Sequence, residues 1–75
     1  MSPESVVANV FDYDVAKISD ATSSESIPTW DSLGQITLLI ELESAYGVSF
    51  SAEEALGMSD VGAIKRMLRE RGVTW

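Results

Sequence analysis

The stretch PTWDSLGQITLLIELESAYG, residues 28–47, contains the longest helical pattern in the chain. Apolar residues between Asp31 and Tyr46 recur around most of the circumference of a helix, so we expect this helix to be the central and most buried one. Gly47 follows Tyr46, as is typical of a left-handed C-terminal cap. One narrow strip of this helix carries small or polar residues, which are Gly34, Thr37, Glu41 and Ser44.

Shorter helices are expected on both sides of this stretch. Pro3 indicates a helix over residues 3–12, and a Ser51–Glu54 capping box indicates a short helix that ends at Gly57. A last helix begins near residues 59–60 and ends at Gly72. Its inner stripe consists of Val61, Ile64, Met67 and Leu68. We therefore predict one all-α domain over residues 1–75, an irregular four-helix bundle with three main helices and one short one.

The connection over residues 13–30 is polar and long for a chain of 75 residues. We expect Val15 and Ile18 to hold it against the core, with a turn of helix around them. Connections of this length commonly carry function or span a bundle.

The composition excludes several classes of small protein. The chain contains neither cysteine nor histidine, which excludes a disulfide framework and the usual ligands of structural zinc. No apolar run approaches the length of a membrane span, and the first residues lack the pattern of a secretory signal. We expect a cytoplasmic protein that acts away from membranes and is stabilised by packed helices.

The net charge of −7 is unevenly distributed. Residues 1–50 contain eight acidic residues against Lys17 alone, whereas the four acidic and four basic residues of positions 51–75 balance. An acidic surface repels nucleic acid and attracts basic protein surfaces. We therefore expect protein partners with basic docking patches, although solubility alone accounts equally well for the charge.

Residues for catalysis are scarce. Ser32 has no histidine or cysteine to serve as its base or partner anywhere in the chain. Asp12 and Asp14 would need a cleft to act as a glycosidase pair, and they lack the spacing of a calcium loop. We expect neither enzymatic activity nor a bound metal.

Ser32 stands at the start of the long helix, and two roles are open to it. Its spacing to Gln35 fits a capping box, in which the hydroxyl would satisfy a backbone N–H. Asp31 is an equally good cap that suits the helix dipole better, and it would leave the hydroxyl to point outward. In that case the positive end of the helix would tolerate a phosphodiester on Ser32.

The segment WDSLGQITLLIELESAYGVSFSAEEA, residues 30–55, resembles the acyl carrier proteins. Their pattern is Asp-Ser-Leu at the start of the second helix of a small acidic four-helix bundle, and Asp31, Ser32 and Leu33 match it. In that family the serine receives phosphopantetheine from coenzyme A, and the thiol of this arm holds acyl groups as thioesters. The resemblance implies that Ser32 is the attachment point and that phosphopantetheine is the covalent cofactor.

The resemblance also implies roles for neighbouring residues. Asp31 would help a phosphopantetheinyl transferase to place magnesium and coenzyme A, and its alternative role is that of a cap alone. Enzymes that load or accept the acyl group would recognise a surface on the second helix. This surface consists of Leu33, Thr37, Ile40, Glu41 and Ser44. The alternative location for Leu33 and Ile40 is the core.

The context of the motif differs from that of common carriers. Fatty-acid carriers typically read Gly-Ala-Asp-Ser-Leu-Asp and peptidyl carriers Leu-Gly-Gly-His/Asp-Ser, whereas this chain reads Thr-Trp-Asp-Ser-Leu-Gly. This form is similar to free-standing carriers of specialised metabolism, including those that present small hydroxy-acid or aminoacyl units to polyketide-type assembly. We expect a monomeric carrier for polyketide, fatty-acid or related pathways, and an unmodified acidic interaction module is the alternative.

Overall fold

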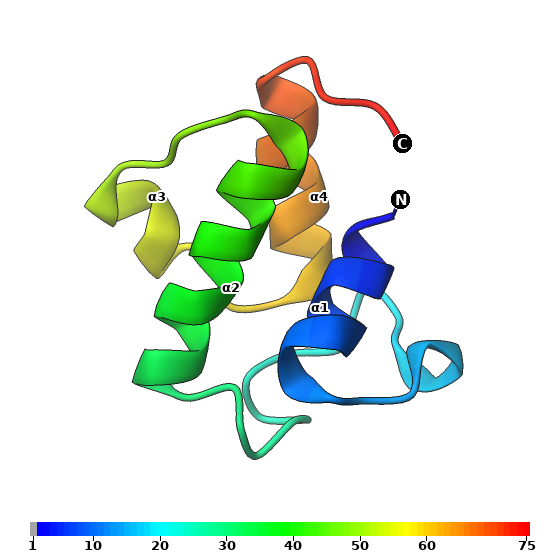
Figure 1. Ribbon diagram of the computed structural model, residues 1–75. Coiled ribbons are helices and arrows are strands. Elements are labelled where there is room, and N and C mark those ends of the chain that lie inside the picture. Colours follow the sequence, from blue (N-terminus) through cyan, green and yellow to red (C-terminus); the bar gives the residue numbers. More distant parts are fainter. Residues whose placement is uncertain (1) are drawn as a thin grey trace.

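The computed structural model describes residues 2–75 (Figure 1). Its helices are α1 (Pro3–Phe11), α2 (Ser32–Tyr46), α3 (Ala52–Leu56) and α4 (Val61–Glu70), and a 3-10 turn η1 (Val15–Lys17) follows α1. The described residues contain no strand, so the prediction of an all-α bundle with three main helices and one short one is confirmed. Across residues 2–75, no helix has the length and apolar character needed to cross a membrane.

The helix ends follow the chemistry of the residues that cap them. Pro3 is the first residue of α1, where its missing N–H has no cost. The predicted capping box between Ser51 and Glu54 opens α3. Gly47 ends α2 with φ of 65°, in the left-handed region that favours glycine. These boundaries agree with the sequence analysis to within one or two residues.

The core lies between α1, α2 and α4, and the connection before α2 contributes to it. The predicted inner stripe of the last helix is confirmed, because Val61, Ile64 and Leu68 are fully buried and Met67 packs against them. The other large buried side chains come from the first two main helices, the connection and the segment after α3: Val6, Val7, Phe11, Ile27, Trp30, Leu38, Leu42 and Met58.

The expectation that α2 is the most buried helix is wrong. Only Leu38 and Leu42 are buried among its 15 residues, whereas α1 buries five of its nine. Leu33 and Ile40 are 76% and 58% exposed. The core covers one side of α2 only, and α3, with five residues, is too short to cover the rest.

Of the two residues predicted to hold the connection between α1 and α2, only Ile18 packs against the core, and the expected turn of helix is η1. Val15 is half exposed, because η1 lies at the edge of the bundle beside α1 (Figure 1), while Ile18 is partly buried against the core. The main attachments are Ile27 and Trp30, which are almost fully buried. The indole of Trp30 stacks on Phe11, with ring centroids 5.3 Å apart and planes inclined by 23°.

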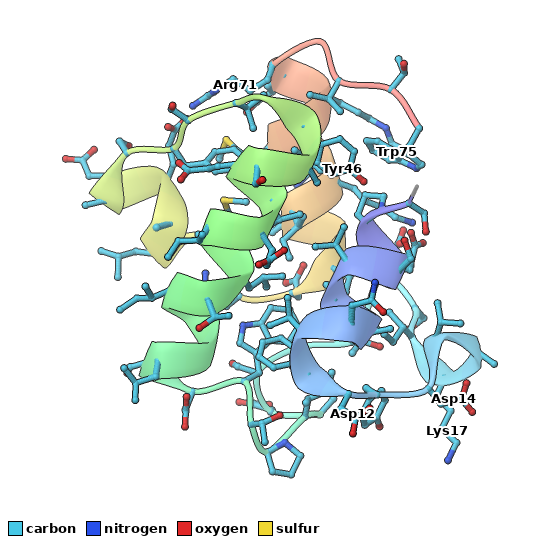
Figure 2. The ribbon with its side chains drawn as sticks, viewed as in Figure 1. Asp12, Asp14, Lys17, Tyr46, Arg71 and Trp75 are labelled. Carbon is cyan, nitrogen blue, oxygen red and sulfur yellow. The ribbon has the colours of Figure 1, made fainter. Side chains whose placement is uncertain are left out.

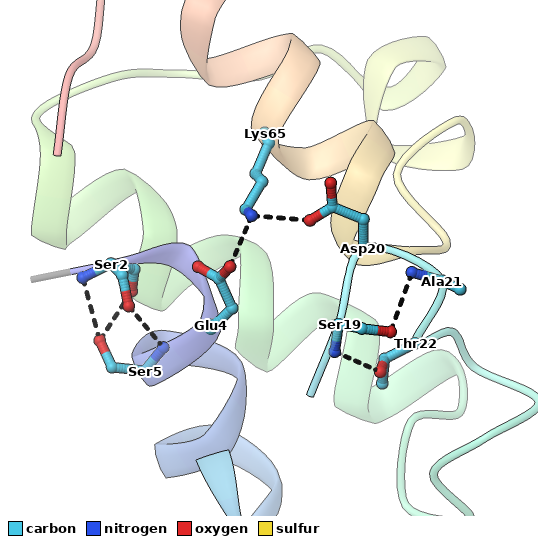
Figure 3. Close-up of polar contacts among 8 residues, drawn as sticks. All are labelled: Ser2, Glu4, Ser5, Ser19, Asp20, Ala21, Thr22 and Lys65. Atoms are coloured by element: carbon cyan, nitrogen blue, oxygen red, sulfur yellow. Dashed lines mark hydrogen bonds and ion pairs between the residues drawn. The ribbon is translucent and has the colours of Figure 1, made fainter. Parts of the chain in front are cut away.

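Hydrogen bonds and ion pairs tie the middle of the connection to α4. The N–H of Val61 donates to the carbonyl of Thr22 at 2.9 Å. The Nζ of Lys65 lies 2.6 Å from a carboxylate oxygen of Asp20 and 2.5 Å from one of Glu4 on α1 (Figure 3). Hydrogen bonds to Asp20 and Glu4 raise the pKa of Lys65, and the bond from Lys65 lowers the pKa of Asp20. The connection is therefore fixed upon the bundle.

Candidate functional site

Ser32 is the first residue of α2, and its side chain is exposed. Asp31 caps the helix, since its carboxylate accepts a hydrogen bond of 2.9 Å from the N–H of Gly34. The hydroxyl of Ser32 makes no hydrogen bond to any residue from 2 to 75. Of the two roles open to Ser32, the structure favours the one in which Asp31 caps and the hydroxyl points outward.

Gln35 does not complete a capping box with Ser32, so that interpretation of the spacing is wrong. Its Oε1 accepts a hydrogen bond of 2.6 Å from the indole Nε1 of Trp30. Its Nε2 donates to the carbonyl oxygens of Ala55 and Met58, each at 3.0 Å. The amide oxygen of Gln35 and both of its N–H groups therefore have partners, and the N–H groups point toward the end of α3.

A groove opens beside Ser32, between α2 and α3, with a volume of about 460 Å³. Asp31 and Ser32 belong to its lining, together with Gln35. Apolar side chains of both helices form much of the remaining wall, among them Ile36, Leu39, Ala55 and Leu56. The exposed hydroxyl therefore borders a surface that an apolar group could contact.

Four large apolar side chains of α2 and α3 are exposed, two of which line this groove, and we call the four the apolar face: Leu33, Ile36, Ile40 and Leu56. The first three recur at helical spacing along one side of α2. Leu56 of α3 is 85% exposed and lines the same groove as Ile36. The core location that was the alternative for Leu33 and Ile40 is excluded.

The remaining residues of the predicted partner surface are also exposed on α2. They are Thr37, Glu41 and Ser44. The hydroxyl of Thr37 donates to the carbonyl of Leu33 at 3.1 Å, within the helix. Sequence reasoning missed Leu56 and Gln35 as members of this site, because only the tertiary structure brings α3 to α2.

Arg71 holds the other end of α3 (Figure 2). Its guanidinium pairs with the carboxylate of Glu54, donates to the carbonyl of Ser49 at 3.3 Å, and lies 5.5 Å from the ring centre of Phe50. The hydrogen bonds from Arg71, and then the one from the Ser51 backbone, lower the pKa of Glu54 to about 2. The start of α3 is thus held by an exposed ion pair.

Comparison with protein-family models gave no match for this chain, and no curated protein matches it. The resemblance to the acyl carrier proteins therefore rests on the sequence alone, on the segment of residues 30–55 that begins with the Asp-Ser-Leu motif and on the order of the helices that follow it.

Proposed function

We propose that the protein is a carrier that holds acyl groups as thioesters on a phosphopantetheine arm attached to Ser32. One observation supports this most strongly: the hydroxyl of Ser32 is exposed and without a hydrogen bond to residues 2–75, because Asp31 caps the helix. Esterification would weaken and crowd the hydrogen bond of a serine that served as the cap. Here the oxygen can be esterified without disturbing the fold.

The residues around Ser32 fit such an arm. A phosphodiester on Ser32 would lie at the positive end of α2, where the first backbone N–H groups have no partner within the helix. Asp31 is exposed beside it and available to the magnesium ion of a transferase. The groove lined by Ile36 and Leu39 offers an apolar surface to the arm or its cargo.

The attachment itself requires only the hydroxyl from this chain. Oγ of Ser32 would form a bond to the phosphorus that carries pantetheine in coenzyme A, and the bond between the two phosphates would break. Adenosine 3′,5′-bisphosphate leaves, and the hydroxyl proton passes to a base of the transferase. The arm then supplies the thiol that forms thioesters, so the chain carries a reactant and catalyses no step.

Partner enzymes would dock on the apolar face. Its four side chains offer apolar contact area, and exposed carboxylates lie near its members in the sequence, at Asp31, Glu41 and Glu53. Basic groups on a partner would pair with these carboxylates and steer the encounter, so association should weaken as salt rises. Tethering of the cargo then raises its local concentration at the active site of the partner.

The experiment incubates the unmodified protein with coenzyme A and a broad-specificity phosphopantetheinyl transferase, and measures the intact mass. We expect a gain of one phosphopantetheine group in the wild type and in Ser49→Ala, which removes an exposed serine outside the predicted partner surface. Ser32→Ala should show no gain. An unchanged mass of the folded wild type, or a gain in Ser32→Ala, would contradict the proposal.

The apolar face also supports the alternative, an unmodified interaction module. In that case Ser32→Ala would bind the physiological partner as tightly as the wild type does, whereas Ile40→Ser would lose binding. A carrier would lose function in both variants. The comparison of these two variants therefore separates the two functions.

A further inference from the structure

We propose that Gln35 is a positioning residue that holds α3 against α2 and thereby sets the width of the groove beside Ser32. Only the effect of this groove width on bound cargo rests on the proposed carrier function. The position of α3 itself is a property of the unmodified protein, so it can be measured without the arm.

The residues of α3 itself bury little surface. The helix has five residues, none of them buried, and Leu56 is almost wholly exposed. A helix of this length is unstable by itself in water. Its place in the fold therefore depends on the segments at its two ends, through the core packing of Phe50 and Met58 and through polar contacts.

The contacts of Gln35 define one orientation of its amide. The indole N–H of Trp30 can only donate, and the carbonyls of Ala55 and Met58 can only accept, so Oε1 must face the indole and Nε2 must face α3. Trp30 is 3% exposed and stacked on Phe11. Gln35 thus connects a ring fixed in the core to the end of α3.

The two ends of α3 are held by different kinds of contact. The ion pair of Glu54 with Arg71 at the start is exposed and is therefore weakened by solvent and salt. The two bonds from Gln35 at the other end are neutral and partly buried, and one of them reaches Met58, which is fully buried. The end of α3 is therefore the more firmly placed of the two.

The contact made by Gln35 lies in the wall of the groove. Ala55, whose carbonyl accepts one of its bonds, lines the groove together with Leu39 of α2. Because Leu56 follows directly, any shift of the end of α3 moves the outer wall relative to α2. Both donors of the Gln35 amide are already used, so its role is to place α3 rather than to bind cargo.

The test replaces Gln35 by methionine, which has a similar length and donates no hydrogen bond. Amide hydrogen exchange of the unmodified protein is followed at Gly57 and Met58, whose N–H groups bond to the carbonyls of Glu54 and Ala55 at 3.1 and 3.2 Å. In Gln35→Met we expect both amides to exchange about tenfold faster or more, since both hydrogen bonds to α3 are lost, together with the one from the indole of Trp30. Amides of α1 and α4 should keep their rates relative to global unfolding.

Gln35→Glu provides a second variant that keeps the core side of the network. It retains an acceptor for the indole of Trp30 and removes both donors to α3. We expect fast exchange at Gly57 and Met58, while the indole N–H of Trp30 stays protected from exchange as in the wild type. Nile red is an apolar dye that reports the groove. Its dissociation constant should differ from the wild-type value in both variants.

Glu54→Gln serves as the matched control, because it weakens the contact at the opposite end of α3 without touching Gln35. In this variant the amides at the start of α3 should exchange faster than in the wild type, and the amide of Met58 should keep its wild-type rate. Exchange at Gly57 and Met58 close to the wild-type rate in Gln35→Glu, or an equal acceleration in all four helices, would overturn the proposal. Loading of Ser32 is measured separately by mass, so failure of the carrier function and failure of this inference are distinguishable.

Discussion

Gly34 lies so close to Phe11 that a Cβ at position 34 would come within 2.8 Å of the phenylalanine ring. The same Cβ would come closer still to the carbonyl oxygen of Thr29. The first turn of α2 thus packs its backbone directly against α1 and the preceding connection. This close approach fixes the place of Ser32, two residues earlier, at the edge of the bundle.

Gly34→Ala should therefore destabilise the protein by about 1–3 kcal/mol, because one of the clashing atoms belongs to backbone that cannot easily move. Alanine is the better helix former, so propensity alone predicts the opposite sign. Urea unfolding followed by circular dichroism measures the difference. Ser44→Ala, an exposed substitution on the same helix, should stay within about 0.5 kcal/mol of the wild type. A variant Gly34→Ala as stable as the wild type would show that the close contact is absent.

The assignment of the cap to Asp31 gives a second prediction. Asp31→Ala removes the carboxylate that accepts from Gly34 and should cost about 1 kcal/mol. Ser32→Ala removes a hydroxyl without a partner among the described residues and should change the free energy of unfolding by less than about 0.5 kcal/mol. The reverse order in urea denaturation would mean that Ser32 is the cap.

The two faces of α2 should respond differently to truncation. Leu38→Ala leaves a cavity in the core and should cost about 2–5 kcal/mol. Ile40→Ala removes an exposed side chain and should cost less than about 1 kcal/mol. Equal losses of stability would indicate that another element covers the apolar face in solution. Binding assays with a partner enzyme should show the opposite ranking, with Ile40→Ala the more damaging.

Acid should release the start of α3. The pKa of Glu54 is lowered from 4.5 to about 2, so its ionised form favours the folded state. The stabilisation is complete above the ordinary pKa and is lost as the pH falls from 4.5 toward about 2. Glu54→Gln should have a lower urea midpoint than the wild type near neutral pH, and this difference should shrink across that acidic range. A difference that stays constant down to the lowest pH would rule out the ion pair as its cause.

Local signals in the sequence predicted the helices well, because their ends depend on nearby residues. Pro3, the Ser51–Glu54 box and Gly47 act within one turn of their own positions. The Asp-Ser-Leu motif likewise identified the residues at the start of α2. The sequence left open whether the hydroxyl of Ser32 caps the helix, since Asp31 and Ser32 could each serve as the cap.

Burial and tertiary hydrogen bonding could not be predicted in the same way. An apolar pattern around most of α2 does not specify which side the core covers, so Leu33 and Ile40 could belong to either side. The polar connection gave no sign that Trp30 would enter the core. Gln35 fitted a local motif in the sequence, while its partners at Ala55 and Met58 lie 20 and 23 residues away.

The attachment of the connection to α4 has a consequence for how a tethered group would travel. The backbone bond from Val61 to Thr22 and the ion pair of Lys65 with Asp20 hold the connection in place, and Trp30 anchors its end just before Ser32. A group carried on Ser32 would swing from a fixed pivot, so the length and joints of the arm, rather than loop motion, would define the space it can sweep.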